Sequence, residues 1–304
     1  MKDLSFLATP AGHFTISAFD HRNSLFELLN PQDPSTVSAD EVVALKRLFI
    51  TAFADISSAI LIDPIYGLDY GLDLTKEVPA NTGILMSLEE SSYTESQAGR
   101  LTQLLPHWGV ADIKAHAAAA KLLLYYHPDA PIAKTQLGLV RRLSRECRQA
   151  QVIFLIEPIL YGLGKYSSRS KVDLTLKIID QLSPLVDILK LEFPLDVLRS
   201  SEPDWLRVSR DLSRHATVPW ILLSRGMGFD HFQTLTQITC SAGASGIAVG
   251  RAVWQEIGDL AKKYPDPTEK LSQIKHFLMT TGRDRLQALT SLVSRFARPW
   301  TAFR

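Results

Sequence analysis

Short apolar stretches rich in β-branched residues recur along the chain, and each ends in polar or turn-forming residues. A segment with helical spacing of apolar residues follows each stretch, as in residues 38–56, where Ser38 is placed to cap a helix and Glu41 lies three positions on. This alternation predicts an α/β protein. The predicted strands are residues 14–22, 57–64, 82–89, 119–128, 151–158, 187–194, 219–226 and 245–252.

Strands that are apolar throughout suit a parallel sheet covered on both faces, either a closed barrel or an open doubly wound sheet. The count of eight and the lack of a glycine-rich dinucleotide fingerprint after the first strand favour a (β/α)8 TIM barrel. The segment 254–264, the proline-containing residues 265–267 and a helical stretch from about 267 to 297 predict extra C-terminal helices. We expect a single domain over residues 1–304.

Composition narrows the range of partners. The chain has 33 Lys and Arg against 32 Asp and Glu, a net charge of about +1, so charge gives no reason to expect nucleic acid or a membrane. A small molecule is the expected partner, and a homo-oligomer is compatible with the sequence. Two cysteines and an N-terminal stretch without a signal-like or spanning apolar run predict a cytoplasmic protein.

Lysine and glutamate interrupt several of the apolar strands. Lys190 lies within "DILKLEFP", and Glu157 follows five apolar residues. A buried charge without a partner costs several kcal/mol, so such groups pair or carry out chemistry. Lys121, at the start of "KLLLYY", either joins them or extends its stem to solvent. Polar residues at the predicted strand ends are Asp20, Arg22, Asp63, Glu89, Lys121, Glu157, Lys190, Ser224 and Arg251; Asp63, before a proline, is read as a turn cap.

The chemistry of a barrel gathers at the C-terminal ends of its strands, so these residues are expected to meet. Two lysines near one carboxylate in a partly dry pocket lower the pKa of one lysine by desolvation and like charge. The neutral amine can then attack a carbonyl and form a Schiff base, while Glu157 supplies and removes protons.

Glycine-rich turns follow the seventh and eighth predicted strands. They contain Ser224, Gly226 and Gly228 in "LLSRGMG", and Gly250 and Arg251 in "AVGRAVW". Backbone N–H groups at such turns and at a helix start bind phosphate in many barrels, although the same glycines also serve as ordinary turn residues.

A metal site is not indicated. The eight histidines show neither H-x-H nor H-E-x-x-H spacing, and the local candidates are His21 beside Asp20 and the pair His107 and His116. We therefore expect no metal and no cofactor.

Several segments together resemble the tagatose 1,6-bisphosphate aldolase family, class I aldolases of the (β/α)8 fold that include sulfofructosephosphate aldolase. The matching segments, in the family's order from about residue 15 to residue 300, are "AFDHRNSL", "ILIDPIYGL", "KLLLYYHPD", "FLIEPILY", "DILKLEFP", "LLSRGM", "AGASGIAVGRAVW" and the tail "LMTTGRDRLQALTSLV" with "RPW".

The resemblance implies roles for single residues. Lys190 matches the Schiff-base lysine, Lys121 the second active-site lysine, Glu157 the proton-shuttling carboxylate, and Asp20 the acid that holds a substrate hydroxyl. Substrate binding is expected of Arg22, Ser224, Arg225, Gly226, Gly250 and Arg251, of which Ser224, Gly226, Gly250 and Arg251 match the site for the phosphate of the dihydroxyacetone half. The implied substrate is a ketohexose with anions at both ends, cleaved between C3 and C4.

Two positions depart from the family pattern. The first motif is usually Asp-Gln-Arg, whereas here His21 stands between Asp20 and Arg22, and an imidazole titrates near neutrality. Arg225 stands where the family has a small residue; it could extend the anion site or point to solvent.

The leading hypothesis is a metal-independent class I aldolase for a ketohexose 1,6-bisphosphate such as tagatose 1,6-bisphosphate. The alternatives are a sulfofructose 1-phosphate aldolase and a non-catalytic sugar-phosphate-binding barrel. A metal-dependent barrel aldolase ranks last.

Overall fold

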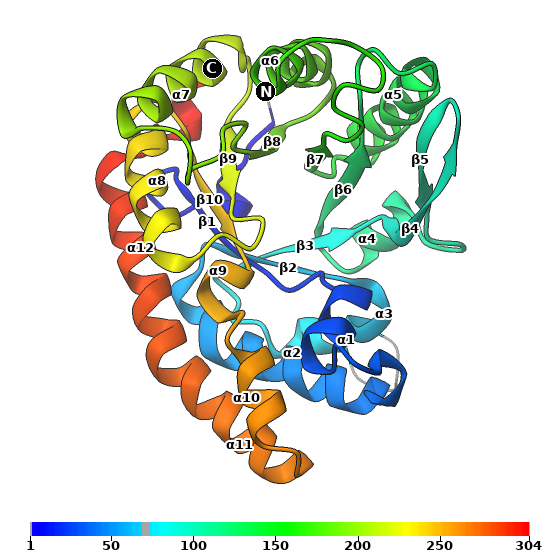
Figure 1. Cartoon of the computed structure of the whole chain (residues 1–304). Coiled ribbons are helices and arrows are strands. Elements are labelled where there is room, and N and C mark those ends of the chain that lie inside the picture. The colour runs from blue at the N-terminus through cyan, green and yellow to red at the C-terminus, as the bar shows by residue number, and fades with distance from the viewer. Residues whose placement is uncertain (1, 69–72, 304) are drawn as a thin grey trace.

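The computed structural model describes residues 2–68 and 73–303. Eight parallel strands close into a barrel in the order β1, β2, β3, β6, β7, β8, β9, β10, and helices surround it (Figure 1). The predicted (β/α)8 fold is confirmed. The barrel strands are β1 Phe14–Ala18, β2 Ala59–Ile62, β3 Gly83–Ser87, β6 Ala119–Tyr125, β7 Phe154–Ile159, β8 Ile188–Glu192, β9 Trp220–Leu223 and β10 Gly246–Val249.

The helices begin at short polar side chains in several places. Ser38 accepts a hydrogen bond from the Glu41 backbone, and Ser201 forms a reciprocal cap with Asp204. Within residues 2–68 and 73–303, no helix has the length and apolar character needed to span a membrane. The main helices are α1 Asn23–Leu29, α2 Ala39–Phe53, α3 Pro64–Leu68, α4 Val110–Ala115, α5 Ala133–Ala150, α6 Lys171–Leu182, α7 Glu202–His215, α8 Phe229–Ser241, α9 Arg251–Trp254, α10 Ile257–Lys263, α11 Pro267–Phe277 and α12 Arg283–Phe296.

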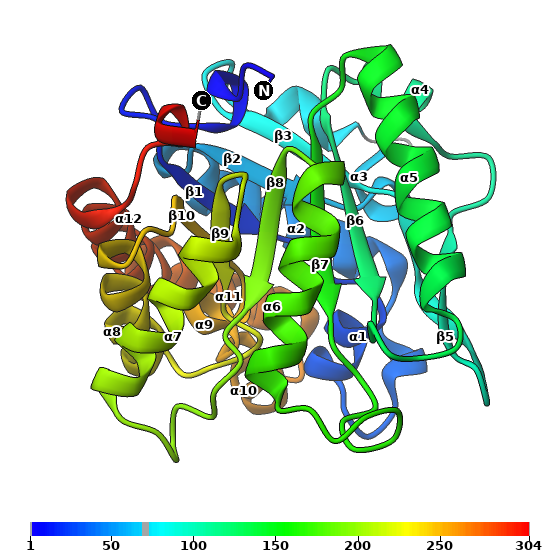
Figure 2. The same cartoon turned by 90° about the horizontal axis from the view of Figure 1, so that it is seen from above.

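The predicted C-terminal helical stretch corresponds to α11 and α12, joined by a π-helical turn over Leu278–Gly282. Helix α12 packs against α8, on the outside of the barrel (Figures 1 and 2). Asp266 caps the start of α11, where Pro267 occupies the first helical position.

All eight predicted strands are present, but each is shorter than predicted. Lys190 lies in the middle of β8 rather than at its end, Lys121 is the third residue of β6, and Asp20 follows the end of β1 by two residues. The polar residues beyond each strand leave the backbone ladder and form the loops at one end of the barrel.

One element was not predicted. An antiparallel hairpin of β4 (Glu89–Ser96) and β5 (Gly99–Leu104) lies between β3 and β6, at the edge of the molecule in Figure 1. Its first strand reads "EESSYTES" and is mostly exposed, so it lacks the apolar pattern that identifies a buried strand.

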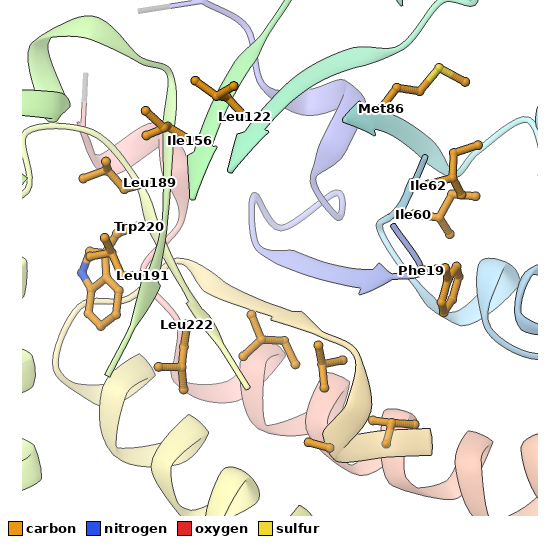
Figure 3. Close-up of a cluster of buried hydrophobic side chains, with 14 of the residues drawn as sticks. Phe19, Ile60, Ile62, Met86, Leu122, Ile156, Leu189, Leu191, Trp220 and Leu222 are labelled. Atoms are coloured by element: carbon orange, nitrogen blue, oxygen red, sulfur yellow. The ribbon is translucent and has the colours of Figure 1, made fainter. Parts of the chain in front are cut away.

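Two apolar layers hold the barrel together. The outer layer packs strands against helices, and Figure 3 shows part of it, including Phe19, Ile156 and Trp220. The inner layer fills one end of the barrel interior, and Leu4, Leu7 and Trp300 from the two ends of the chain pack against it. Its other residues are Phe14, Ile16, Ala18, Ala59, Leu61, Leu85, Ala119, Ile153, Leu155, Ile188, Ile221 and Ala248, all in barrel strands except Ile153, which precedes β7.

Lys46 and Asp63 form a buried ion pair that the sequence did not reveal. The Lys46 Nζ to Asp63 Oδ2 distance is 2.6 Å, and the side chains are 1% and 0% exposed. Lys46 also donates to the backbone oxygens of Phe19 and His21, at 2.5 and 2.9 Å. Asp63 accepts from the Tyr66 backbone N–H at 3.0 Å, so the predicted turn cap is present as well. The pair therefore anchors the loop that follows β1.

We expect Lys46→Met to lower the free energy of unfolding by about 3–5 kcal/mol, because Asp63 would be left without its ion-pair partner in a dry site. Urea unfolding followed by circular dichroism measures this. The exposed pair of Arg47 and Glu77 provides the control: Arg47→Met should cost about 1 kcal/mol or less. The double variant Lys46→Met, Asp63→Asn should recover part of the loss, and a single variant as stable as the wild type would contradict the prediction.

Candidate active site

The candidate site is the next layer of inward-facing residues above the inner apolar layer. Side chains two residues apart on a strand share a face, so Lys121 follows Ala119, Glu157 follows Leu155 and Lys190 follows Ile188 into the barrel interior. Leu122, Ile156, Leu189 and Leu191 belong to the outer layer. The pleat therefore sends the charged side chains inward and the apolar ones toward the helices.

The two predicted lysines share one carboxylate. Lys190 Nζ lies 2.7 Å from Glu157 Oε2, and Lys121 Nζ lies 3.3 Å from the same oxygen. Lys121 also contacts Asp20 Oδ2 at 2.6 Å. The structure thus brings together all four residues predicted to be catalytic. Lys121 is 1% exposed, so the alternative of a lysine reaching solvent is wrong.

Glu89 completes the cluster. The sequence pattern predicted only that it lies at the end of a strand. Its Oε1 lies 2.6 Å from Lys121 Nζ, and its Oε2 accepts from the Leu123 backbone N–H at 3.0 Å. Arg22 donates to the Glu89 backbone oxygen at 2.5 Å and is buried. The third predicted strand ends at this glutamate. Its position at the C-terminal end of a barrel strand is the feature that could have assigned it to the site.

The carboxylates determine the protonation of this cluster. Burial opposes a charge on Lys121, but Asp20, Glu89 and Glu157 raise its pKa well above the ordinary lysine value. Burial would raise the pKa of Asp20 and of Glu157, yet the two ammonium groups lower both. Lys121 is therefore a fixed cation, and the two carboxyl groups are carboxylates. The predicted lowering of a lysine pKa does not apply to Lys121; for Lys190 it stays a prediction.

A cavity of about 750 Å³ opens above the cluster. It is large enough for a sugar with two phosphate groups. The predicted site residues that line it are Asp20, Arg22, Lys121, Glu157, Lys190, Ser224, Arg225, Gly226, Gly250 and Arg251.

The two predicted phosphate-binding turns meet at one wall of this cavity. Gly226 has a positive φ of +75°, which favours glycine, and a Cβ added there would lie 3.5 Å from the Arg251 guanidinium carbon. A Cβ at Gly250 would lie 3.1 Å from His21 Cε1. The Gly226 turn and the Arg251 side chain therefore lie side by side at this wall of the cavity.

Arg225 lines the same cavity, but its guanidinium forms an ion pair with Glu192. Glu192 also pairs with Lys171, and the Arg225 side chain is half exposed. Arg225 therefore faces the cavity and the solvent at once, and its guanidinium is already paired. Anion binding by Arg225 stays a prediction, and it would require release from Glu192.

His21, which replaces the family's glutamine, is a partly buried imidazole whose side chain is 21% exposed. Its ring meets Trp254 edge-on at 5.1 Å, and Nδ1 lies 4.0 Å from Asp20 Oδ1. Burial lowers the pKa of His21 to about 4; Asp20 opposes this, and the positive charges of Arg251, Lys190 and Lys46 add to it. The ring is therefore neutral at pH 7 instead of titrating near neutrality as the sequence suggested.

Among residues 2–68 and 73–303, no three His, Cys, Asp or Glu side chains are grouped to hold a metal ion. The three carboxylates of the cluster face Lys121, whose ammonium group occupies the position between them.

Residues 14–256 match the model of the DeoC/LacD family aldolase. The tagatose 1,6-diphosphate aldolase of Lactococcus lactis subsp. lactis is 26% identical, over 99% of this chain and 97% of the relative. That of Listeria monocytogenes serotype 4a is 28% identical, over 97% of this chain and 91% of the relative.

Solved structures share the fold. The fructose-bisphosphate aldolase of Plasmodium falciparum superposes with a TM-score of 0.67 at 14% identity, covering 97% of this chain and 93% of the other. An archaeal fructose-1,6-bisphosphate aldolase, with its catalytic lysine bound to a carbinolamine intermediate, gives 0.59 at 16% identity, covering 86% and 96%.

The fold and these relatives define the chain as a carbon–carbon lyase of the aldolase class. It belongs to the DeoC/LacD family of aldolases.

The low pKa of His21 predicts how the free energy of unfolding depends on pH. Because the unfolded histidine has an ordinary pKa of 6.5 and the folded one about 4, the unfolded state binds more protons between these values. The free energy of unfolding should therefore fall as the pH is lowered from 6.5 toward 4, by about 1.4 kcal/mol for each unit of pH.

Urea unfolding at a series of pH values measures this fall. In His21→Gln, the free energy of unfolding should change less with pH between pH 6.5 and 4.5. At lower pH, the carboxylates Asp20 and Glu157 add a further loss of stability. An unchanged profile in the variant would contradict the assignment, as would an NMR titration of the His21 ring with a midpoint near 6.5.

Proposed function

We propose that the protein is a metal-independent, Schiff-base aldolase that cleaves a ketohexose 1,6-bisphosphate. The observation that carries this proposal is the 2.7 Å contact between Lys190 and Glu157 at the floor of the cavity, with Lys121 on the other side of the same carboxylate. A nucleophilic amine, a proton carrier and a fixed cation are the groups that carbonyl cleavage through an imine requires.

In the first stage, the Lys190 ammonium transfers a proton to Glu157, and the free amine adds to the C2 ketone of the substrate. The resulting carbinolamine loses its hydroxyl as water once that oxygen is protonated. Glu157 returns the proton directly, and the ammonium of Lys121, 3.3 Å from Glu157, stabilises the carboxylate that remains. The product of this stage is an iminium between Lys190 and C2.

In the second stage, Glu157, which is a carboxylate again, accepts the C4 hydroxyl proton as the C3–C4 bond breaks, and it later returns this proton to C3. The bonding electrons move toward the iminium nitrogen, which gives an enamine on Lys190 and releases the three-carbon aldehyde. Protonation of the enamine at C3 and hydrolysis of the imine release dihydroxyacetone phosphate and restore the lysine. Asp20, a carboxylate held by Lys121 at 2.6 Å, is suited to orient a substrate hydroxyl.

The phosphate of the dihydroxyacetone half is assigned to the wall formed by Gly226, Gly250 and Arg251. The cradle between these residues, where an added Cβ at Gly226 would approach the Arg251 guanidinium, supports this assignment. Ser224, which also lines the cavity, is assigned to the same phosphate.

Tagatose 1,6-bisphosphate is the first candidate substrate, because the curated relatives that match almost the whole chain are tagatose 1,6-diphosphate aldolases. Sulfofructose 1-phosphate is the second. The expected partner is thus a small sugar phosphate, and a cytoplasmic reaction is in keeping with two buried free cysteines.

We expect borohydride to trap dihydroxyacetone phosphate covalently on Lys190, as read by peptide mass mapping. Lys190→Met, which keeps the length but removes the amine, should give no adduct and abolish cleavage. The control is Lys262→Met on the exposed surface of α10, which should behave as the wild type. An adduct on a different lysine with Lys190 unmodified would overturn the assignment, and binding without turnover of any bisphosphate would indicate the non-catalytic alternative.

Glu157→Gln keeps the shape of the side chain but cannot carry the proton. Its kcat should fall by about 10²- to 10⁴-fold, the usual contribution of a general acid or base. Steady-state assays of aldehyde release give this value, and a loss below tenfold would assign proton transfer to another group.

Dialysis against EDTA should leave the rate of cleavage unchanged, since the proposed electron sink is the iminium. The assay is steady-state cleavage before and after chelation. A loss of activity that added divalent zinc restores would favour a metal-dependent aldolase instead.

A further inference from the structure

The cavity extends beyond the lysine–carboxylate cluster to a wall that none of the proposed steps uses. This wall carries Arg100 of β5, Tyr125 of β6 and Tyr161 from the loop after β7. In the barrel order, β6 lies four strands from β10 in either direction, so the end of β6 is diametrically opposite the Gly250 turn. The cavity therefore has two ends, with Lys190 on β8 midway between them.

The barrel fixes the backbone of Arg100. The fully buried Gln136 side chain donates to the Arg100 oxygen at 2.9 Å and to the Tyr125 oxygen at 2.6 Å. The Arg100 backbone N–H donates to the Tyr161 hydroxyl at 2.9 Å. A Cβ at the preceding Gly99 would lie 2.3 Å from that hydroxyl, and its φ is +131°, so only glycine permits this approach.

Aromatic faces hold the guanidinium of Arg100 at the cavity wall. Its central carbon lies 4.5 Å from the ring centre of Tyr93, 5.2 Å from that of Tyr161 and 5.7 Å from that of Tyr125. Its Nε is buried without a hydrogen-bond partner in the described part of the chain, 3.5 Å from the exposed Glu95. A solvent-exposed pair at that distance contributes little. The guanidinium therefore has donors left for a ligand.

We propose that Arg100, framed by Tyr93, Tyr125 and Tyr161, binds the anionic group at the end of the substrate farthest from the Arg251 phosphate. This inference rests on the proposed function. The ligand is a terminal tetrahedral oxyanion, a phosphate or a sulfonate, because the planar guanidinium fork matches two of its oxygens. The fixed backbone and the ring stacking orient the fork before the substrate arrives. The unpredicted hairpin is thus the element that selects substrates with an anion at both ends.

The competing candidate for this anion is Arg22. It is 6% exposed, lines the cavity and has two guanidinium nitrogens without hydrogen-bond partners in the described residues. Its third nitrogen binds the Glu89 backbone oxygen, which places it beside the Lys121 cluster. Arg22 is thus tied to the cluster around Lys121, whereas Arg100 is held at the far wall by aromatic faces, so we assign the terminal anion to Arg100.

The test compares Arg100→Met, which keeps the stacked volume, with Arg142→Met, an exposed arginine on α5, as the control. Tagatose 1,6-bisphosphate, tagatose 1-phosphate and 6-deoxy-6-sulfofructose 1-phosphate are the substrates, and borohydride trapping of dihydroxyacetone phosphate is the integrity assay. For Arg100→Met, kcat/KM for the bisphosphate should fall by about 10- to 100-fold, mainly through KM, since a hydrogen-bonded charged pair is lost.

Activity on tagatose 1-phosphate and trapping of dihydroxyacetone phosphate should stay within about threefold of the wild type, because neither ligand carries an anion to the far wall. Arg100→Lys should recover part of the loss, as it keeps the charge without the fork. Arg100→Met should lose more kcat/KM for one of two substrates, the bisphosphate or the sulfonate. The substrate with the larger loss identifies the anion that Arg100 binds.

Failures of the two proposals are distinguishable. A wild type that forms no adduct on Lys190 overturns the proposed function. A wild type that forms it, with Arg100→Met keeping the full preference for the bisphosphate, overturns the Arg100 subsite alone. Loss of that preference in Arg22→Met but not in Arg100→Met would move the subsite to the loop after β1.

Discussion

The chemistry of this barrel depends on one buried cation held by three carboxylates. Lys121 contacts Asp20 from the loop after β1, Glu89 from the start of β4 and Glu157 from β7. Removing one partner of such a cluster leaves an uncompensated charge in a dry interior, which costs about 3–5 kcal/mol. The arrangement of these loops and strands is therefore fixed by the charge that they surround. Because Lys121 keeps its proton, Glu157 stays a carboxylate and can exchange a proton with Lys190.

The strand pleat explains why the charges gather at one end. Inward-facing residues alternate with outward-facing ones, and the inner positions change from apolar to charged within one step, as from Leu155 to Glu157 and from Ile188 to Lys190. The apolar step fills the barrel interior, and the charged step forms the floor of the cavity. The sequence pattern contained this information, since a charge within an apolar run has few stable positions. This is why Lys190, Glu157 and the eight strands could be predicted.

Features that depend on pairing across the chain could not be predicted in this way. The first strand of the β4–β5 hairpin is mostly polar and exposed, so it shows no apolar period. Lys46 occupies an ordinary position in an amphipathic helix, and only the folded chain brings it to Asp63. The contact of Arg225 with Glu192 joins two loops at neighbouring strand ends, and its direction depends on side-chain geometry rather than on spacing.

The position of Lys190 relates the two halves of the cavity to the cleavage of a six-carbon chain. Strand β8 lies two strands from β10, which ends at the Gly250 turn, and two strands from β6, which ends beside Arg100. A linear sugar held by anions at both ends would therefore cross the centre of the barrel, into which the Lys190 side chain points, with C2 to C4 near its middle. In the proposed reaction, the barrel interior supplies the amine and the proton carrier. The loops and the hairpin would then set the separation of the two proposed anion sites, and that separation, instead of the reacting groups, would select the length of the substrate.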